Sequence, residues 1–123
     1  MNTANPAAAK AGPPLSPFRK AGNLLFVSGQ LPRGPSGAIV EGDIAVQSEV
    51  ALGNLLAVLE RAGSGVKDIV KVTVWLTDPA DADGFNQVYR RYFAEPFPAR
   101  SVVVSGLIAP GALLEIEATA VLG

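Results

Sequence analysis

Apolar residues between positions 43 and 62 recur with the spacing of an amphipathic helix. Asp43 is a suitable N-cap, and Gly63 is a suitable residue just beyond the last turn. The pattern predicts a long helix over 43–62 whose broad apolar face carries Ile44, Ala51, Leu52, Leu55, Val58, Leu59 and Ala62. Gln47, Asn54 and Arg61 border that face, and a thinner stripe of Val46, Val50 and Ala57 stays unassigned.

A strict alternation over 69–77 is typical of a strand instead. One face is expected to carry Val70, Val72, Val74 and Leu76, and the other Lys71, Thr73, Trp75 and Thr77. Asp78 followed by Pro79 then predicts the start of a second helix. That helix should run to about Phe93, because four apolar residues within it keep i, i+3, i+4, i+7 spacing: Phe85, Val88, Tyr89 and Tyr92.

Three further apolar segments, 24–29, 101–105 and 113–122, are predicted to be strands. The order is therefore strand, helix, strand, helix, strand, strand. This order favours an α+β fold in which two α-helices cover one face of a single mixed β-sheet. The opposite face is mixed, since it would carry Lys71, Thr73, Trp75, Ser101, Val103, Glu115 and Glu117. It is too apolar to face water freely and too polar for a core, so packing against other copies of the chain would explain it.

Composition agrees with one such domain and limits its chemistry. Hydrophobic residues make up 49% of the 123 residues, a surplus that also indicates an oligomer. We expect residues 1–16, rich in alanine and proline, to be a loose N-terminal arm, and 17–123 to form a single domain. The formal net charge of −1 gives no basic patch, so no nucleic acid or membrane partner is expected.

The chain has neither cysteine nor histidine. Thiolate and imidazole ligands are therefore missing, no acidic cluster has suitable spacing, and we expect no metal and no cofactor. The first residues contain no apolar segment typical of a signal peptide, so the expected location is the cytoplasm.

Two charged residues remain as candidates for chemistry. Arg100 precedes an apolar strand, and Glu115 lies in the next one, fourteen residues after Ser101. Arginine offers a planar fork that matches a carboxylate, and a glutamate can accept a proton from water. Together they could hold and hydrolyse a small anionic substrate. From the residues alone, Arg100 could instead form a structural ion pair, and Glu117 shares the expected face of Glu115, so spacing does not choose between the two glutamates.

Six segments, in this order along the chain, resemble the RidA/YjgF family of reactive intermediate deaminases, also labelled L-PSP or translation-inhibitor proteins. They are residues 16–18 (SPF), 27–32 (VSGQLP), 68–71 (DIVK), 85–89 (FNQVY), 97–101 (FPARS) and 114–118 (LEIEA). The resemblance implies a chorismate-mutase-like fold and a homotrimer around a central barrel, with sites between subunits. It also implies hydrolysis of enamines and imines of small 2-amino acids, the 2-iminopropanoate and 2-iminobutanoate class, to 2-keto acids and ammonia.

The resemblance also implies the roles of individual residues. Arg100 would hold the substrate carboxylate and Glu115 would position the water. The remaining pocket would be lined by Phe18, Ser28, Gly29, Asn86, Ser101 and Val102. On sequence grounds Ser28 and Gly29 could simply end a strand, Asn86 could be a polar residue of a helix surface, and Phe18 could belong to the core.

Two of these residues depart from the pattern of many family deaminases. Phe18 stands where they have a tyrosine, and Val102 where they have a cysteine. Both changes make the site more apolar, so a different, ring-derived enamine is one alternative substrate. A non-catalytic trimer that binds 2-keto acids is a second alternative. The ribonuclease activity in the family's older label is disfavoured by the pI of about 5.3 and by the lack of histidine and of aromatic residues interleaved with basic ones.

Overall fold

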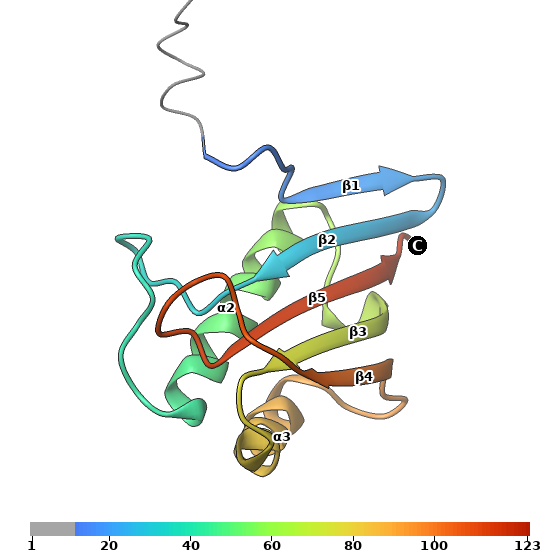
Figure 1. Ribbon diagram of the computed structural model, residues 1–123. Coiled ribbons are helices and arrows are strands. Elements are labelled where there is room, and N and C mark those ends of the chain that lie inside the picture. The colour runs from blue at the N-terminus through green and yellow to red at the C-terminus, as the bar shows by residue number, and fades with distance from the viewer. Residues whose placement is uncertain (1–11) are drawn as a thin grey trace, which may run out of the picture.

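Five strands form one sheet in the spatial order β1-β2-β5-β3-β4 (Figure 1). The computed structural model describes residues 12–123. Among these residues, the strands are β1 (Phe18–Ala21), β2 (Leu24–Gln30), β3 (Ile69–Leu76), β4 (Ala99–Val104) and β5 (Leu114–Val121), and the α-helices are α2 (Ile44–Arg61) and α3 (Ala82–Tyr92). Only the β3–β4 pair is parallel, so the sheet is mixed. In Figure 1, α2 lies behind the sheet and α3 lies beside its β3–β4 end. The buried residues of α2 and α3 belong to one core cluster with those of the sheet, which confirms the expected α+β architecture.

Helix α2 begins and ends where its sequence predicts. The Asp43 carboxylate accepts a hydrogen bond from the Val46 amide at 3.1 Å, and Gly63 follows the helix with a φ of 80°. The whole predicted apolar face is buried. In contrast, the side chain of Val46 in the unassigned stripe is 46% exposed, so that stripe is not part of the core.

Strand β3 departs from the predicted alternation at its first residues. Ile69 is paired with Ala120 and Lys71 with Thr119, so Val70 is an extra residue in a β-bulge. As a result Ile69 is buried and Val70 is 47% exposed. The prediction that Val70 faces the core was therefore wrong, while Val72, Val74 and Leu76 do face it.

Strand β1 was not predicted at all. It pairs with β2 through a two-residue turn, Gly22–Asn23, in which Gly22 has a φ of 59°. Such a turn between two extended segments is a hairpin signal. It was missed because the first segment is short and polar, FRKA. Residues 1–11 of the expected arm lie outside the described residues, and 12–17 contain no helix or strand.

The second helix begins later than expected. Asp78 does cap a helical turn, because its carboxylate accepts from the Ala80 amide at 2.9 Å, but that turn is the 3-10 helix η2 (Pro79–Asp81). Helix α3 follows and buries Phe85, Val88 and Tyr89. The loop after it leads into β4, which begins two residues earlier than the predicted strand.

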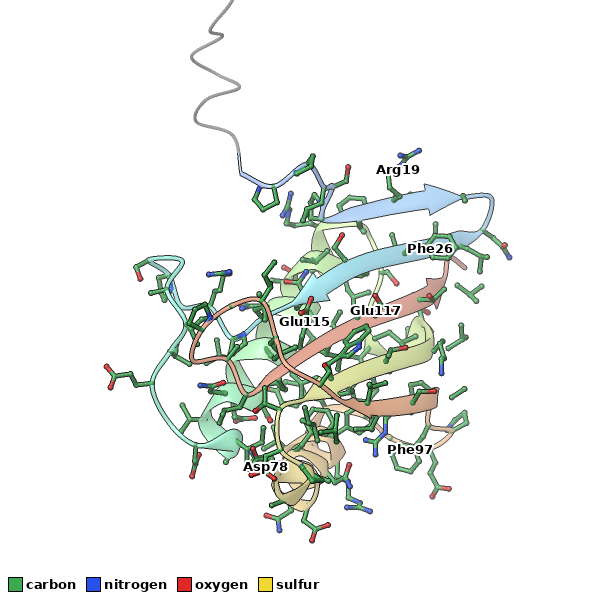
Figure 2. All side chains as sticks on the ribbon, in the orientation of Figure 1. Arg19, Phe26, Asp78, Phe97, Glu115 and Glu117 are labelled. Carbon is green, nitrogen blue, oxygen red and sulfur yellow. The ribbon has the colours of Figure 1, made fainter. Side chains whose placement is uncertain are left out.

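The two faces of the sheet differ sharply. The face under the helices is apolar and buried, with Leu25, Val72, Val74, Leu114, Ile116 and Ala120 all fully buried. The other face, called the open face below, carries Glu115 and Glu117 from β5 (Figure 2). Strand register places Trp75 beside Glu115, and Thr73 beside both Glu117 and Ser101, as the alternation predicts. In the described part of the chain, no helix has the length and apolar character needed to cross a membrane.

Candidate functional site

A bulge in β2 positions Gly29 against the Glu115 carboxylate. The β2–β5 register pairs Val27 with Ala118 but Gln30 with Ile116, so β2 contains one extra residue around Ser28 and Gly29. A Cβ on Gly29 would overlap Glu115 Oε2 and would lie 2.9 Å from Glu115 Cδ. The glycine therefore provides the space that the carboxylate occupies.

The surroundings of Glu115 favour its protonated form more than water does. Burial raises the pKa of the Glu115 carboxyl above its ordinary value, and the charge of Glu117 raises it further, while Arg33 acts in the opposite direction. A carboxylate with a raised pKa is a stronger base. Glu115 also borders a hollow of about 220 Å³, the Glu115 hollow, lined in addition by Trp75, Ser105, Gly106, Leu107 and Ile108.

Two polar residues of α2 hold the loops beside Glu115. The buried Gln47 side chain donates to the carbonyls of Val40 and Gly111 and accepts from the Leu113 amide at 2.7 Å. Asn54 donates to the carbonyls of Leu31 and Arg33, each at 3.0 Å. Sequence reasoning assigned neither residue this role, although polar residues that border a buried helix face are a usable signal for loop anchoring.

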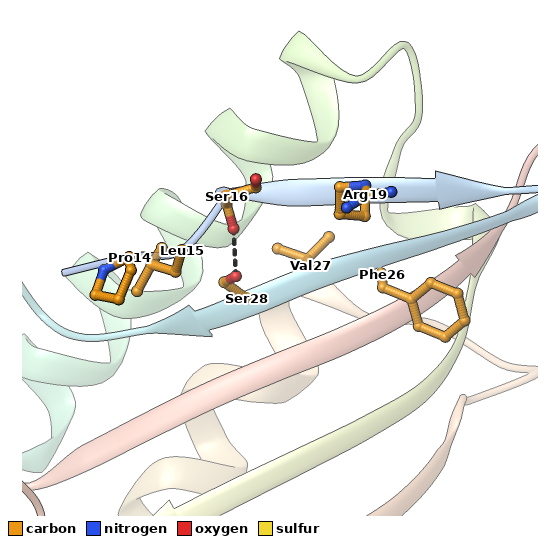
Figure 3. A pocket seen from close by; sticks show the side chains of 7 residues that line it. All are labelled: Pro14, Leu15, Ser16, Arg19, Phe26, Val27 and Ser28. Atoms are coloured by element: carbon orange, nitrogen blue, oxygen red, sulfur yellow. Dashed lines mark hydrogen bonds between the residues drawn. The ribbon is translucent and has the colours of Figure 1, made fainter.

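Ser28 holds the segment that precedes β1. Its hydroxyl donates to the Ser16 carbonyl at 2.5 Å (Figure 3). Its amide donates to the Pro17 carbonyl at 3.0 Å. The segment and β2 border a shallow hollow of about 540 Å³, lined by Pro14, Leu15, Ser16, Arg19, Phe26, Val27 and Ser28. The Ser28 hydroxyl proton is thus already used within the chain.

Arg100 lies in a different hollow, the Arg100 hollow, of about 240 Å³. It is lined by Asn86, Tyr89 and Arg90 of α3 and by Phe97, Pro98 and Arg100 before and within β4. Phe97 is seen at the edge of the sheet near α3 in Figure 2. The guanidinium carbon of Arg100 is 4.8 Å from the centre of the Tyr89 ring and 5.7 Å from that of Phe85. Among the described residues, the one ion pair joins Arg91 to Glu49, so Arg100 has no carboxylate within ion-pair distance there.

A single chain does not bring Arg100 and Glu115 together. Arg100 is paired in register with Val72, whose side chain is fully buried on the helix-covered side. Glu115 is paired with Trp75 on the open face, and β3 separates the two strands. The two residues therefore lie on opposite faces of the sheet, so one small substrate bound to one chain cannot touch both.

The other predicted site residues divide in the same way. Asn86 and Val102 lie on the side of Arg100, whereas Ser101 is on the open face, where its hydroxyl accepts from the Lys71 ammonium at 2.9 Å. Phe18 is paired with the buried Val27 and packs against the core. Sequence reasoning assigned Tyr89 only to the core and missed it as part of the site, although its ring centre lies 4.8 Å from the guanidinium carbon of Arg100.

The described residues contain no cluster of side chains that could coordinate a metal ion. Within residues 12–123, no three histidine, cysteine, aspartate or glutamate side chains gather closely enough to hold a metal ion. The described residues do offer a carboxylate base in Glu115 and a guanidinium in Arg100.

Comparison with known proteins gives consistent matches over nearly the whole chain. The family model described as Endoribonuclease L-PSP matches residues 5–122. The 3-aminoacrylate deaminase RutC of Acinetobacter baylyi is 41% identical over 112 residues, which cover 88% of this chain and 89% of that protein. Human 2-iminobutanoate/2-iminopropanoate deaminase is 35% identical over 119 residues, covering 94% of this chain and 87% of that protein.

Solved structures agree with the sequence matches. The crystal structure of RidA from an Antarctic Psychrobacter superposes with a TM-score of 0.85 at 34% identity and covers 91% of each chain. Sequence, fold and strand order thus lead to one assignment: this chain is a member of the RidA/YjgF family, the family whose model is described as Endoribonuclease L-PSP.

Proposed function

We propose that the protein hydrolyses reactive imines or enamines of small 2-amino acids to 2-keto acids and ammonia. The observation that carries the proposal is the Arg100 guanidinium, held over the Tyr89 ring in a hollow where the described residues offer it no carboxylate. A planar guanidinium in such a position suits a substrate carboxylate. The names of the relatives, deaminases of 3-aminoacrylate and of 2-imino acids, support the same reaction class.

The site is proposed to lie between two copies of the chain. Arg100 and Glu115 are on opposite faces of one sheet, so a common substrate would need Arg100 from one copy and Glu115 from another. The mixed open face supports an assembly in which copies pack through it, and a homotrimer is the assembly that we propose. Ser28 and Gly29 would accompany Glu115, whereas Asn86 and Val102 would accompany Arg100. Phe18 and Ser101 are proposed to line the pocket less directly, Phe18 from the core and Ser101 from the open face.

The reaction consumes one water and needs no redox step. Arg100 binds the substrate carboxylate, and Glu115 takes a proton from a water whose oxygen attacks the imine carbon. Glu115 then gives that proton to the imine nitrogen, which yields an amino alcohol. In the second half, Glu115 takes the hydroxyl proton and transfers it to the amine. The oxygen then forms the C=O double bond of the 2-keto acid as the C–N bond breaks, and ammonia leaves with the C–N electron pair. Positioning and one general base, worth about 10²–10⁴-fold, are sufficient for so reactive a substrate.

A second candidate substrate class is 3-aminoacrylate, favoured by the 41% identity to the RutC protein. Its amino group is one carbon farther from the carboxylate than that of a 2-imino acid. An Arg100-bound 3-aminoacrylate would therefore present a different carbon to the Glu115 water.

The test is a panel of 2-imino acids generated in situ by an amino-acid oxidase with catalase, with keto-acid release followed with and without the protein. A parallel series uses 3-aminoacrylate, a chelator-treated sample, and RNA as a cleavage blank. We expect acceleration with at least one imine or enamine, no effect of the chelator, no RNA cleavage, and loss of the acceleration in Arg100→Ala. A wild-type protein that accelerates none of these hydrolyses, but binds 2-ketobutyrate, would support the non-catalytic alternative.

A further inference from the structure

Three aromatic residues form a buried ladder along α3 and its C-terminal end. Phe85, Tyr89 and Phe93 are spaced four residues apart, so they share one face of the helix. The Tyr89 and Phe93 rings are stacked, with centroids 4.1 Å apart and an interplanar angle of 14°, and Phe85 is tilted against Tyr89 at 5.6 Å. Their side chains are 1%, 5% and 4% exposed, in chain order. Packing on both sides therefore fixes the Tyr89 ring.

Arg100 reaches over this ladder from an edge strand. Its backbone is held by pairing with Val72, while its side chain is otherwise exposed at the end of the sheet. The rings of Tyr89 and Phe85, at 4.8 and 5.7 Å, are the aromatic groups beneath the guanidinium. A cation is attracted to the face of an aromatic ring, and this attraction leaves the N–H donors of the guanidinium for an anion.

The phenol of Tyr89 has a different character from that of an ordinary surface tyrosine. Its hydroxyl oxygen is buried and has no hydrogen-bond partner among residues 12–123. Burial raises the pKa of the Tyr89 hydroxyl, and the Arg100 charge lowers it by less, so the phenol stays neutral at neutral pH. The contact with Arg100 is thus one between a cation and a neutral ring.

We propose that Tyr89 is a positioning residue of the Arg100 hollow: its fixed ring holds the guanidinium in the orientation that grips a substrate carboxylate. This inference rests on the proposed role of Arg100 as the carboxylate anchor. It assigns the ring, not the hydroxyl, as the group that matters. Tyr89→Phe should therefore preserve binding of a carboxylate ligand, whereas substitution of Tyr89 by an aliphatic residue should weaken it.

The test measures binding of 2-ketobutyrate by calorimetry to the wild-type protein and to three variants at their native assembly state. Tyr89→Leu should raise Kd about three- to thirty-fold, the range that cation–aromatic contacts span from exposed to desolvated sites. Tyr89→Phe should stay within about twofold of wild type. The matched control is Tyr92→Leu, the same change three positions along the helix, where the ring makes no contact of this kind with Arg100, and it should also stay within about twofold.

A double-mutant cycle separates positioning from general loosening of the helix. In an Arg100→Lys background, which lacks the planar fork, Tyr89→Leu should change Kd by less than about twofold. Equal losses in both backgrounds would overturn the proposal, as would an unchanged Kd in Tyr89→Leu or an equal loss in Tyr89→Phe. The imine assay is judged separately: a wild-type protein that binds 2-ketobutyrate without turnover refutes the deaminase proposal and leaves this test intact.

A measurement on the wild-type protein covers the case in which Tyr89→Leu does not fold. The δ and ε protons of Arg100, assigned by comparison with Arg100→Lys, should show upfield ring-current shifts in the NMR spectrum. Those signals should also move on titration with 2-ketobutyrate. Arg100 protons at ordinary chemical shifts, or ones that do not respond to 2-ketobutyrate, would overturn the proposal without any Tyr89 variant.

Discussion

Gly29 of β2 and Glu115 of β5 compete for one small volume, because a Cβ on Gly29 would overlap Glu115 Oε2. The backbone of Gly29 is not in the positive-φ region, so an alanine can adopt its conformation there. What has to move is the end of a flexible side chain, which costs the fold little. The relationship therefore matters for the position of the carboxylate more than for stability.

Gly29→Ala should accordingly separate function from folding. We expect a melting temperature near that of wild type and a loss of imine turnover of about tenfold to a hundredfold, because the displaced carboxylate no longer faces the water it must activate. The control is Gly53→Ala in α2, where a Cβ meets no atom within 4 Å. That change should stabilise the helix by about 1 kcal/mol and leave turnover unchanged. Full activity in Gly29→Ala would show that the Glu115 carboxylate is not held by this contact.

Glu115→Gln should abolish most turnover, and Glu117→Gln should not. Glutamine keeps the size of glutamate but cannot take a proton from water, so kcat should fall by about 10²–10⁴ in the first variant. Binding of 2-ketobutyrate and the mass of the assembly should stay close to wild type in both. An inactive Glu117→Gln beside an active Glu115→Gln would place the base two residues later in β5.

The pH dependence of kcat/KM should report the surroundings of Glu115. The carboxyl must be ionised to act as a base, and its pKa is raised by burial and by Glu117 and lowered by Arg33. Glu117→Gln should therefore move the acidic limb of the profile to lower pH, whereas Arg33→Gln should move it to higher pH. Ionisation of the substrate is common to all three profiles, so only their differences are interpreted. Shifts in the same direction would contradict this electrostatic picture.

Arg100→Lys should be nearly as damaging as Arg100→Ala. Lysine retains the charge but loses the two-point fork, and losing a charged hydrogen-bonding partner typically costs about 1.5–3 kcal/mol, or about ten- to a hundredfold in kcat/KM. Steady-state kinetics on one imine would measure both variants. A fully active lysine variant would mean that Arg100 acts only as a positive charge.

The assembled protein should have about three times the 12.7 kDa mass of one chain in light scattering on a sizing column. Val103 is 41% exposed and shares the open face with Trp75, so Val103→Asp should weaken the assembly by introducing a charge where copies are proposed to pack. Gln87→Asp, on the exposed surface of α3, is the control and should leave the mass unchanged. A stable wild-type monomer at micromolar concentration would contradict both the trimer and the proposed intersubunit site.

Local sequence patterns were sufficient for the parts of the fold in which each residue's role depends on its near neighbours. The helical period and caps of α2 and the alternation of β5 are such cases, because capping and side-chain direction are decided within a few residues. The same alternation also predicted which residues of β3 and β5 lie on the open face of the sheet. The Gly22–Asn23 turn was also readable but was overlooked, since the strand before it lacks apolar residues.

Tertiary structure alone decided the features that depend on strand pairing. The bulge at Val70 arises from the register of β3 against β5, and the bulge near Gly29 from that of β2 against β5, neither of which alternation can indicate. The first bulge turns the Val70 side chain away from the core, and the second places the backbone of Gly29 against the Glu115 carboxylate. The opposite directions of Arg100 and Glu115 and the aromatic ladder beneath Arg100 likewise follow from which strands and helices become neighbours. Sequence alone determined which groups could do the chemistry, and pairing and packing determined that one chain cannot bring them to a single substrate.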